Sequence, residues 1–160
     1  MKILYKRGDL VTAPETIIAH GCNAQGKMKS GVAKVIREAF PEAYSAYTVH
    51  IELNKRTRVD VLGTIAWAVH NYNIPGCEKV IANMITQRYY GRDPDVTYVD
   101  YDAIRSCMKR MNKKAKEFTT APHRVAMPMI GAGLGNGDWD QIEAIIEEES
   151  TNFQPVVYQL

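Results

Sequence analysis

The run Met127-Pro128-Met129-Ile130-Gly131-Ala132-Gly133-Leu134-Gly135-Asn136-Gly137 places four glycines in seven positions. It follows an apolar segment, and a segment with helical spacing begins directly after it. Glycine lets a backbone turn through positive φ and approach a ligand closely, while a helix start adds free N–H donors and partial positive charge. The run therefore predicts a strand-to-helix junction that holds an anion such as a diphosphate. A tight connection that uses glycine only for its turns is the alternative.

Two common nucleotide-binding motifs do not fit this run. A Walker loop needs Gly-Lys-Ser/Thr after its second glycine, and the dinucleotide fingerprint needs GxGxxG after the first strand with an acidic residue about twenty positions later. The missing fingerprint weakens an NAD-dependent oxidoreductase as an interpretation.

Apolar runs rich in branched residues alternate with segments of helical spacing along the whole chain. The runs predict strands at Ile3–Tyr5, Thr16–Ala19, Leu62–Val69, Val80–Ile85, Val125–Ile130 and Val156–Tyr158. The spacing predicts helices at Gly31–Phe40, Pro41–His50, Tyr101–Phe118 and Trp139–Ser150. This order predicts an α/β fold, a three-layer α/β/α sandwich with a mixed, largely parallel six-stranded sheet. In open sheets of this kind, ligands bind beyond the carboxyl ends of the strands.

The last predicted helix has a clear start signal. Asp138 precedes Trp139, and Gln141 follows three residues after Asp138, which is the spacing of a capping box. Asp138 is therefore predicted to cap a helix, with a catalytic acid as the alternative.

Size and composition predict one domain over residues 1–160. A length of 160 residues fits the usual range of roughly 100 to 200 per domain. The 20 basic and 18 acidic residues give a net charge of +2, which falls short of the strongly basic balance of many nucleic-acid-binding domains. The opening MKILYKRGDL soon reaches a charge, and no apolar run approaches the roughly 18 residues of a spanning helix, so we expect a cytoplasmic protein.

The three cysteines indicate free thiols in a reducing compartment. Cys22, Cys77 and Cys107 form no CxxC motif and lie far apart in sequence. Because no cluster has metal-ligand spacing, we expect neither a metal nor a cofactor. A Cys22 nucleophile beside His20 is an alternative without an identifiable carboxylate to orient the pair.

A second glycine-bearing junction, AHGCNAQGKMKSGVA, spans residues 19–33 and would face the first one. It offers hydrogen-bonding groups and local cations, namely His20, Asn23, Gln25, Lys27 and Lys29. A sugar phosphate matches this chemistry. A structural histidine at a strand end and a turn asparagine are the alternatives.

Four motifs, read together, resemble the macro domain family over nearly the whole chain. They are Gly8-Asp9-Leu10, His20-Gly21-Cys22-Asn23 with Ser30-Gly31-Val32-Ala33, the run from Met127 to Gly135 with Trp139, and Val157-Tyr158-Gln159-Leu160. The resemblance is closest to the branch of ADP-ribose 1″-phosphate phosphatases and hydrolases of terminal ADP-ribose. It implies a mixed sheet between helices, with ADP-ribose in a cleft across the strand ends.

The resemblance also implies a ligand contact for each motif. Asp9 would accept a hydrogen bond from the adenine amino group, beside the backbone of Leu10, and Tyr158 would line the adenine end. Asn23 would hold the distal ribose. The residues around the diphosphate and distal ribose would be Met28, Lys29, Ser30, Gly31, Val32, Ile130, Gly131, Ala132, Gly133, Leu134 and Gly135.

The predicted activity is hydrolysis of ADP-ribose 1″-phosphate to ADP-ribose and phosphate. The family usually carries Asn where His20 stands, and a histidine there resembles the phosphatase members. An unperturbed imidazole titrates near pH 6.5, so His20 is predicted to be the general acid or base, with Asn23 orienting the ribose. Lys29 departs from the family's small residues and could pair with a terminal phosphate or reshape the loop.

Other functions compete with this prediction. One is a non-catalytic module that binds ADP-ribose, and another is a hydrolase that removes ADP-ribose from protein or nucleic acid. Family hydrolases that act on acidic side chains use a Lys and an Asp, whereas Gln87 and Gly135 match those positions here.

An RNA-binding surface is the last alternative. It would use Lys109, Arg110, Lys113, Lys114 and Lys116 together with Arg88-Tyr89-Tyr90-Gly91-Arg92. The near-balanced charge favours a solvated helix face instead. The segment Gln87–Thr97 would then be an exposed excursion in which Tyr89 and Tyr90 cap the ligand or pack.

Overall fold

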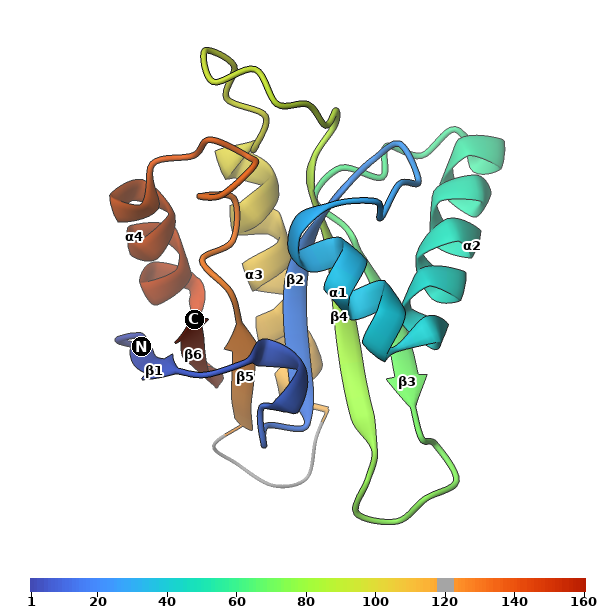
Figure 1. The fold of residues 1–160 in the computed structure, drawn as a ribbon, viewed down its shortest axis with the longest axis vertical. Helices are drawn as coiled ribbons and strands as arrows, with labels where there is room; N and C mark the ends of the chain where they lie inside the picture. Colours follow the sequence, from blue (N-terminus) through green and yellow to red (C-terminus); the bar gives the residue numbers. More distant parts are fainter. Residues whose placement is uncertain (118–122) are drawn as a thin grey trace.

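A computed structural model describes residues 1–117 and 123–160. Its strands and helices follow the predicted alternation (Figure 1). They are β1 Leu4–Arg7, the short 3-10 helix η1 Leu10–Thr12, β2 Ile17–Asn23, α1 Gly31–Ala39, α2 Pro41–Thr57, β3 Ile65–His70, β4 Lys79–Gln87, α3 Tyr101–Ala115, β5 His123–Met127, α4 Trp139–Glu149 and β6 Phe153–Gln159. Phe118, the predicted end of α3, lies outside the described residues.

The six strands form one mixed sheet in the order β1-β6-β5-β2-β4-β3. Every neighbouring pair is parallel except β3 and β4, which are antiparallel. The predicted sandwich with a largely parallel sheet is therefore confirmed. Because β2, β4 and β5 run in the same direction, the loops after them meet at one edge of the sheet (Figure 1).

Helices cover both faces of the sheet, and apolar side chains of the central strands pack against them. Ile17 and Ala19 of β2 pack with the buried faces of α3 and α4, whereas Ile18 of the same strand packs with α1. This alternation follows from the two-residue period of a strand. The end of β2 reaches a third apolar cluster, which contains Cys22 and Tyr47.

Several elements extend further than their sequence patterns predict, among them α2 and β2. α2 continues past His50 to Thr57. The next residue, Arg58, ends the helix with a left-handed φ of 56°. Its last turns expose residues such as Leu53, so the apolar period that marks a buried helix face is absent there. β2 continues past Ala19 to Asn23 because helices and neighbouring strands cover both of its faces.

Asp138 caps α4 as predicted, since its carboxylate accepts from the Asp140 N–H at 3.0 Å. In a capping box the Gln141 side chain would accept from the Asp138 N–H. In the structure this N–H donates instead to the hydroxyl of Tyr101 in α3, at 2.9 Å.

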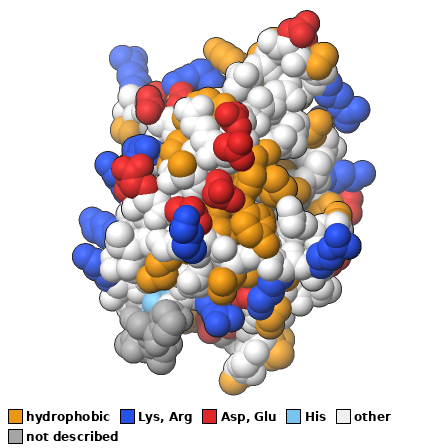
Figure 2. Space-filling model, turned by 90° about the vertical axis from the view of Figure 1, so that its left-hand side faces the viewer, with side chains coloured by type: hydrophobic (Ala, Val, Ile, Leu, Met, Phe, Trp, Pro, Cys, Tyr) orange, Lys and Arg blue, Asp and Glu red, His pale blue; other side chains and the backbone are white. Residues whose placement is uncertain are grey.

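The edge strand β1 is fastened to α4 through side chains. The Tyr5 hydroxyl donates to Glu143, and the Trp139 indole N–H donates to the Tyr5 oxygen at 3.0 Å. Figure 2 shows hydrophobic side chains beside acidic ones on this side of the molecule. Among the described helices, none has both the length and the hydrophobicity to cross a bilayer.

Candidate functional site

A cavity of about 590 Å³ lies where β2, β4 and β5 end. Sites for small molecules usually have volumes of roughly 300 to 1,000 Å³. Its walls come from the loop after β2 with the start of α1, the end of β4 with the segment after it, and the loop after β5. The lining residues are Gly21, Cys22, Asn23, Lys27, Lys29, Ser30, Gly31, Val32, Ala33, Thr86, Gln87, Tyr90, Gly91, Arg92, Pro128, Met129, Ile130, Gly131, Gly133, Leu134 and Gly135.

The polar loop, residues 24–30, is shaped by a buried tyrosine of α2. The Tyr47 hydroxyl lies 2.5 Å from the main-chain oxygen of Asn23 and accepts the N–H groups of Gly26 at 3.0 Å and Lys27 at 3.1 Å. Asn23 adds a second set of bonds, since its Oδ1 accepts from the Gln25 N–H and its Nδ2 donates to the Lys27 carbonyl. The loop is therefore ordered from inside the protein.

The glycine loop, residues 128–137, turns sharply over the end of β5. Gly131 has φ of 75°, and a Cβ on Gly135 would lie 2.8 Å from the Gly131 carbonyl oxygen, so both positions require glycine. Within the described chain, no protein acceptor bonds the N–H groups of Gly133, Leu134 and Gly135. Such unused backbone donors are typical of anion sites.

The polar loop and the glycine loop meet at the start of α1. A Cβ on Gly31 would lie 3.3 Å from Cδ1 of Leu134, a tight contact that a small shift of the exposed Leu134 side chain would have to relieve. Gly31 also has φ of 60°. The first turn of α1, whose N–H groups have no acceptor within the helix, thus lines the same cavity as the glycine loop.

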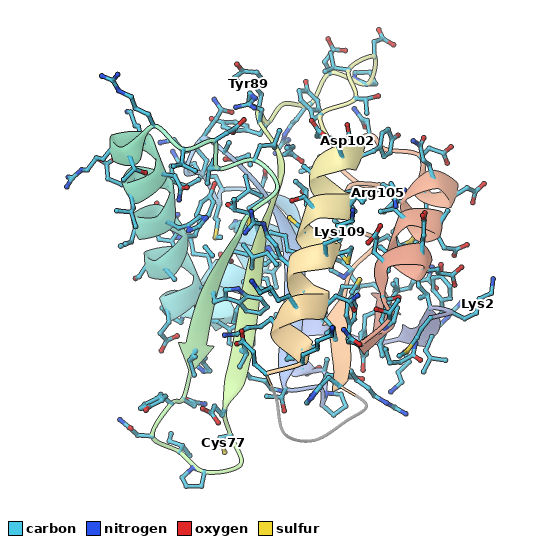
Figure 3. The ribbon with its side chains drawn as sticks, turned by 180° about the vertical axis from the view of Figure 1, so that it is seen from behind. Lys2, Cys77, Tyr89, Asp102, Arg105 and Lys109 are labelled. Atoms are coloured by element: carbon cyan, nitrogen blue, oxygen red, sulfur yellow. The ribbon has the colours of Figure 1, made fainter. Side chains whose placement is uncertain are left out.

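The β4–α3 segment, residues 88–100, joins the two loops across the cavity. Its end returns to β4, because Val99 forms an antiparallel bridge with Gln87. The Tyr90 N–H donates to Gln25 Oε1 at 3.0 Å, which connects the segment to the polar loop. Asn136 Nδ2 donates to the carbonyls of Asp93 at 2.9 Å and Val96 at 2.8 Å, which connects it to the glycine loop. Figure 3 shows Tyr89 at this end of the molecule.

The charge of the cavity wall favours an anion. Lys27, Lys29 and Arg92 line it, and none of the three forms an ion pair with a described residue. The described lining contains neither Asp nor Glu. Burial raises the pKa of the Cys22 thiol well above its usual value, so this lining residue stays a neutral thiol.

Many of the predicted site residues meet at this cavity. These are Asn23, Lys29, Ser30, Gly31, Val32, Ile130, Gly131, Gly133, Leu134 and Gly135. The predicted residues outside its lining are His20, Asp9, Leu10, Gln25, Met28, Ala132 and Tyr158. Met28 packs instead in the apolar cluster of Tyr47, and Leu10 packs against α1.

Neither Asp9 nor Tyr158 lines the cavity: Asp9 directly precedes η1, and Tyr158 lies in β6. Asp9 is exposed, and its Oδ1 accepts the Val11 N–H at 3.0 Å as the cap of η1. The Tyr158 hydroxyl donates to Glu15 at 2.7 Å, and the Tyr158 ring lies 3.6 Å from where a Cβ on Gly8 would stand. Contacts of Asp9 and Tyr158 with an adenine therefore stay predictions.

The position of His20 corrects its predicted role as general acid or base. His20 lies within β2, its side chain is fully buried, and its Nε2 lies 2.6 Å from Asn83 Oδ1. Burial lowers the pKa of His20 to about 4, so the ring is neutral near pH 7. In this structure the His20 side chain neither lines the cavity nor reaches solvent, which argues against direct proton transfer to a substrate oxygen or water.

Several lining residues at the end of β4 and directly after it received no ADP-ribose contact from the sequence. They are Thr86, Gln87, Gly91 and Arg92. The signal for Thr86 and Gln87 was present, since a strand parallel to β2 must end at the same edge of the sheet. Among the described residues, no group of three or more His, Cys, Asp or Glu could hold a metal ion.

The family model of the macro domain matches residues 19–146, which include both loops and the cavity wall. The chain belongs to the macro domain family. It is 31% identical to an uncharacterized 17.5 kDa protein of Enterobacteria phage T4, over 98% of this chain and 96% of the phage protein. It is also 28% identical to an ADP-ribose 1″-phosphate phosphatase of Meyerozyma guilliermondii, over 92% of this chain and 93% of the yeast protein.

Other macro domain relatives have different named activities. A DNA ADP-ribosyl glycohydrolase of Thermus aquaticus is 26% identical over 90% of this chain, which spans 36% of that protein. The solved macrodomain of Thermus aquaticus DarG superposes with a TM-score of 0.77 and 25% identity, covering 99% of this chain and 98% of the other. The predicted resemblance to the macro domain family is thus confirmed.

Proposed function

We propose that this macro domain binds ADP-ribose in the described cavity and hydrolyses ADP-ribose 1″-phosphate to ADP-ribose and inorganic phosphate. The observation that carries the proposal is a cavity with three cations, no carboxylate, and unused backbone N–H groups in its described wall. A phosphate-rich ligand fits this wall better than a neutral sugar, because each phosphate oxygen can accept from a backbone donor or a cation.

Binding would place the diphosphate between the start of α1 and the glycine loop. The N–H groups of Gly133, Leu134 and Gly135 would donate to its oxygens. Asn23, which also lines the cavity, would hold the distal ribose, as the family resemblance implies. The adenine would extend toward Asp9, as the family resemblance implies. The lining cations Lys27, Lys29 and Arg92 would then be available to the terminal phosphate.

Hydrolysis would transfer the terminal phosphoryl group to water. The water oxygen forms a bond to phosphorus, the bond from phosphorus to the ribose oxygen breaks with its electron pair on that oxygen, and a proton from water ends on the released ADP-ribose. Phosphoryl transfer passes through a loose transition state, so positioning and charge stabilisation supply most of the catalysis. Lys29 and the backbone donors can stabilise this charge without a titrating imidazole.

A non-catalytic ADP-ribose-binding module is the second candidate, and a specific observation favours it. The described lining contains no Asp, Glu or His, the side chains that most often act as general bases near neutral pH. Removal of ADP-ribose from an acidic side chain finds less support, because Gln87 and Gly135 stand where the resemblance implies a Lys and an Asp.

The test is to incubate the purified chain with ADP-ribose 1″-phosphate in the presence of a chelator and to follow phosphate and ADP-ribose by chromatography. We expect equal amounts of both products. In the same preparation, titration calorimetry with ADP-ribose measures binding independently of turnover. Binding without phosphate release would replace the phosphatase with the binding module, and the absence of both would overturn the cavity as an ADP-ribose site. The free cysteines support a reducing, cytoplasmic setting for either function.

A further inference from the structure

The three cations of the cavity wall differ in how they are held. Lys27 and Lys29 belong to the polar loop, whereas Arg92 belongs to the β4–α3 segment. A lysine ammonium is a flexible point charge, but the planar guanidinium of arginine can donate two parallel hydrogen bonds to one phosphate. We propose that Arg92 selects ligands that carry a terminal phosphate on the distal ribose. This inference rests on the proposed function, because it assigns the phosphate specificity of the same site.

Arg92 is fixed between two anchored points of the β4–α3 segment. On one side, the Tyr90 N–H bonds Gln25 at 3.0 Å, and the Ala24 N–H bonds the Arg88 carbonyl at 3.3 Å. On the other side, Asn136 bonds the Asp93 carbonyl at 2.9 Å. The backbone is thus held on both sides of Arg92, which lines the cavity although its side chain is exposed to solvent.

The neighbouring acid does not neutralise Arg92. The Asp93 carboxylate accepts the Asp95 N–H at 3.0 Å within its own turn, and the Asp93 N–H donates to the Tyr98 hydroxyl. By contrast, Arg88 of the same segment forms an ion pair with Asp60 at 2.9 Å and does not line the cavity. The segment thus carries one arginine with a structural partner and one that is available to a ligand.

Gln25 acts through Arg92 as a positioning residue. Gln25 is outside the cavity lining, and its Oε1 holds the backbone two residues before Arg92. Its removal should loosen the placement of Arg92 without removing a ligand contact. Gln25→Leu and Arg92→Gln should each raise KM for ADP-ribose 1″-phosphate, and in the double variant the two effects should be less than additive.

The test compares two ligands that differ only in the terminal phosphate. For the wild type, Arg92→Gln and the matched control Arg88→Gln, calorimetry gives the Kd of ADP-ribose, and kinetics give KM and kcat for ADP-ribose 1″-phosphate. We expect Arg92→Gln to raise KM for the phosphorylated compound by about 10- to 100-fold, as the loss of a charge-assisted contact implies. Its Kd for ADP-ribose should stay within about twofold, and Arg88→Gln should match the wild type in both measurements.

Failure of this inference is distinguishable from failure of the phosphatase proposal. If the wild type does not hydrolyse ADP-ribose 1″-phosphate, the phosphatase proposal fails, and calorimetry with the intact compound then tests Arg92 directly. If Arg92→Gln weakens the binding of ADP-ribose and of ADP-ribose 1″-phosphate equally, or weakens neither, the selective role of Arg92 is overturned. If the effects of Gln25→Leu and Arg92→Gln on KM are additive in the double variant, Gln25 does not act through Arg92.

Discussion

The Nε2 atom of His20 lies 2.6 Å from Oδ1 of Asn83 in the buried layer between the sheet and α2. Asn83 Nδ2 donates to the carbonyls of Ala43 at 3.1 Å and Ala66 at 3.0 Å, which fixes the orientation of the amide. Its Oδ1 must therefore accept, so Nε2 of His20 carries the proton in a neutral imidazole. The histidine joins β2 to β4 and, through Asn83, to α2 and β3.

This relationship predicts that acid destabilises the protein well above the range in which carboxylates titrate. Burial lowers the pKa of His20 from 6.5 to about 4, so the unfolded chain binds a proton below pH 6.5 that the folded chain binds only near pH 4. Stability from this group is fully present above pH 6.5 and is lost as pH falls toward 4. Between pH 7 and pH 5 the expected loss in the free energy of unfolding is about 2 kcal/mol.

Urea unfolding at several pH values between 5 and 7 measures this loss. Burial also lowers the pKa of His50, with Arg110 as the second cause, so His50 adds a loss of the same sign. The experiment therefore uses His50→Gln as its background. A stability that stays constant from pH 7 to pH 5 in that background would show that His20 is charged in the folded protein, which contradicts the neutral assignment.

A second prediction concerns the glycine loop. A Cβ on Gly133 would meet no protein atom within 4 Å, and its φ is not in the left-handed region, so Gly133→Val should fold normally and project its methyl groups into the cavity. We expect calorimetry to detect no ADP-ribose binding, with a free energy of unfolding within about 0.5 kcal/mol of the wild type.

Ala132→Val is the matched control for Gly133→Val, since Ala132 is the preceding residue and does not line the cavity. It should retain ADP-ribose affinity. Wild-type affinity in a folded Gly133→Val protein would refute the assignment of the glycine loop to the ligand.

The third prediction tests how α2 orders the polar loop. Tyr47→Phe removes the hydroxyl that bonds the main chain of Asn23, Gly26 and Lys27. Because the Gly26 N–H loses its acceptor and the Lys27 N–H keeps only Asn23 Oδ1 at 3.3 Å, we expect a loss of about 1–2 kcal/mol in stability and roughly tenfold weaker ADP-ribose binding.

Tyr44→Phe is the control on the same helix, because the Tyr44 ring stacks with Arg37 at 3.8 Å and its hydroxyl forms no hydrogen bond with a described residue. We expect thermal unfolding and calorimetry to separate the two variants clearly. Equal affinities in both would mean that the polar loop keeps its binding shape without Tyr47.

Local patterns predicted the elements and the two glycine-bearing loops, because each depends on periodicity or on the turning of the backbone nearby. They did not predict the side of β2 on which His20 lies. The segment HGCN contains glycine and polar residues, so its strand conformation depends on burial by α2 and pairing with β4, which are distant in sequence. A strand that ends at Ala19, as the pattern predicts, places His20 in a loop that a ligand can reach.

The sequence did not predict that Arg92 lines the cavity, for a related reason. The segment around it was predicted to be an exposed excursion, and most of its residues are exposed. The segment that carries Arg92 is held at the cavity by one hydrogen bond to Gln25 and two from Asn136, whose partners lie 65 and 40 or more residues away in sequence. No spacing within the segment marks such contacts, because their partners lie on two other loops.

The last prediction separates the cavity thiol from a catalytic nucleophile. Cys22 lines the cavity, yet burial raises its pKa well above the usual value, and burial raises the pKa of Cys107 to about 12. Cys77 is exposed at the end of the molecule opposite the cavity (Figure 3). Because the thiolate is the form that reacts, iodoacetamide at pH 7.5 should modify Cys77 alone in the folded protein.

Peptide mass spectrometry identifies which cysteine carries the label, and labelling in urea, where all three should react, shows that each peptide is detectable. Since the imidazole of His20 stays neutral beside Cys22, with 3.6 Å between Cys22 Sγ and Nε2, it cannot stabilise a thiolate as an imidazolium would. Rapid modification of Cys22 that ADP-ribose prevents would contradict this argument, because it would require a reactive thiolate at the ligand site.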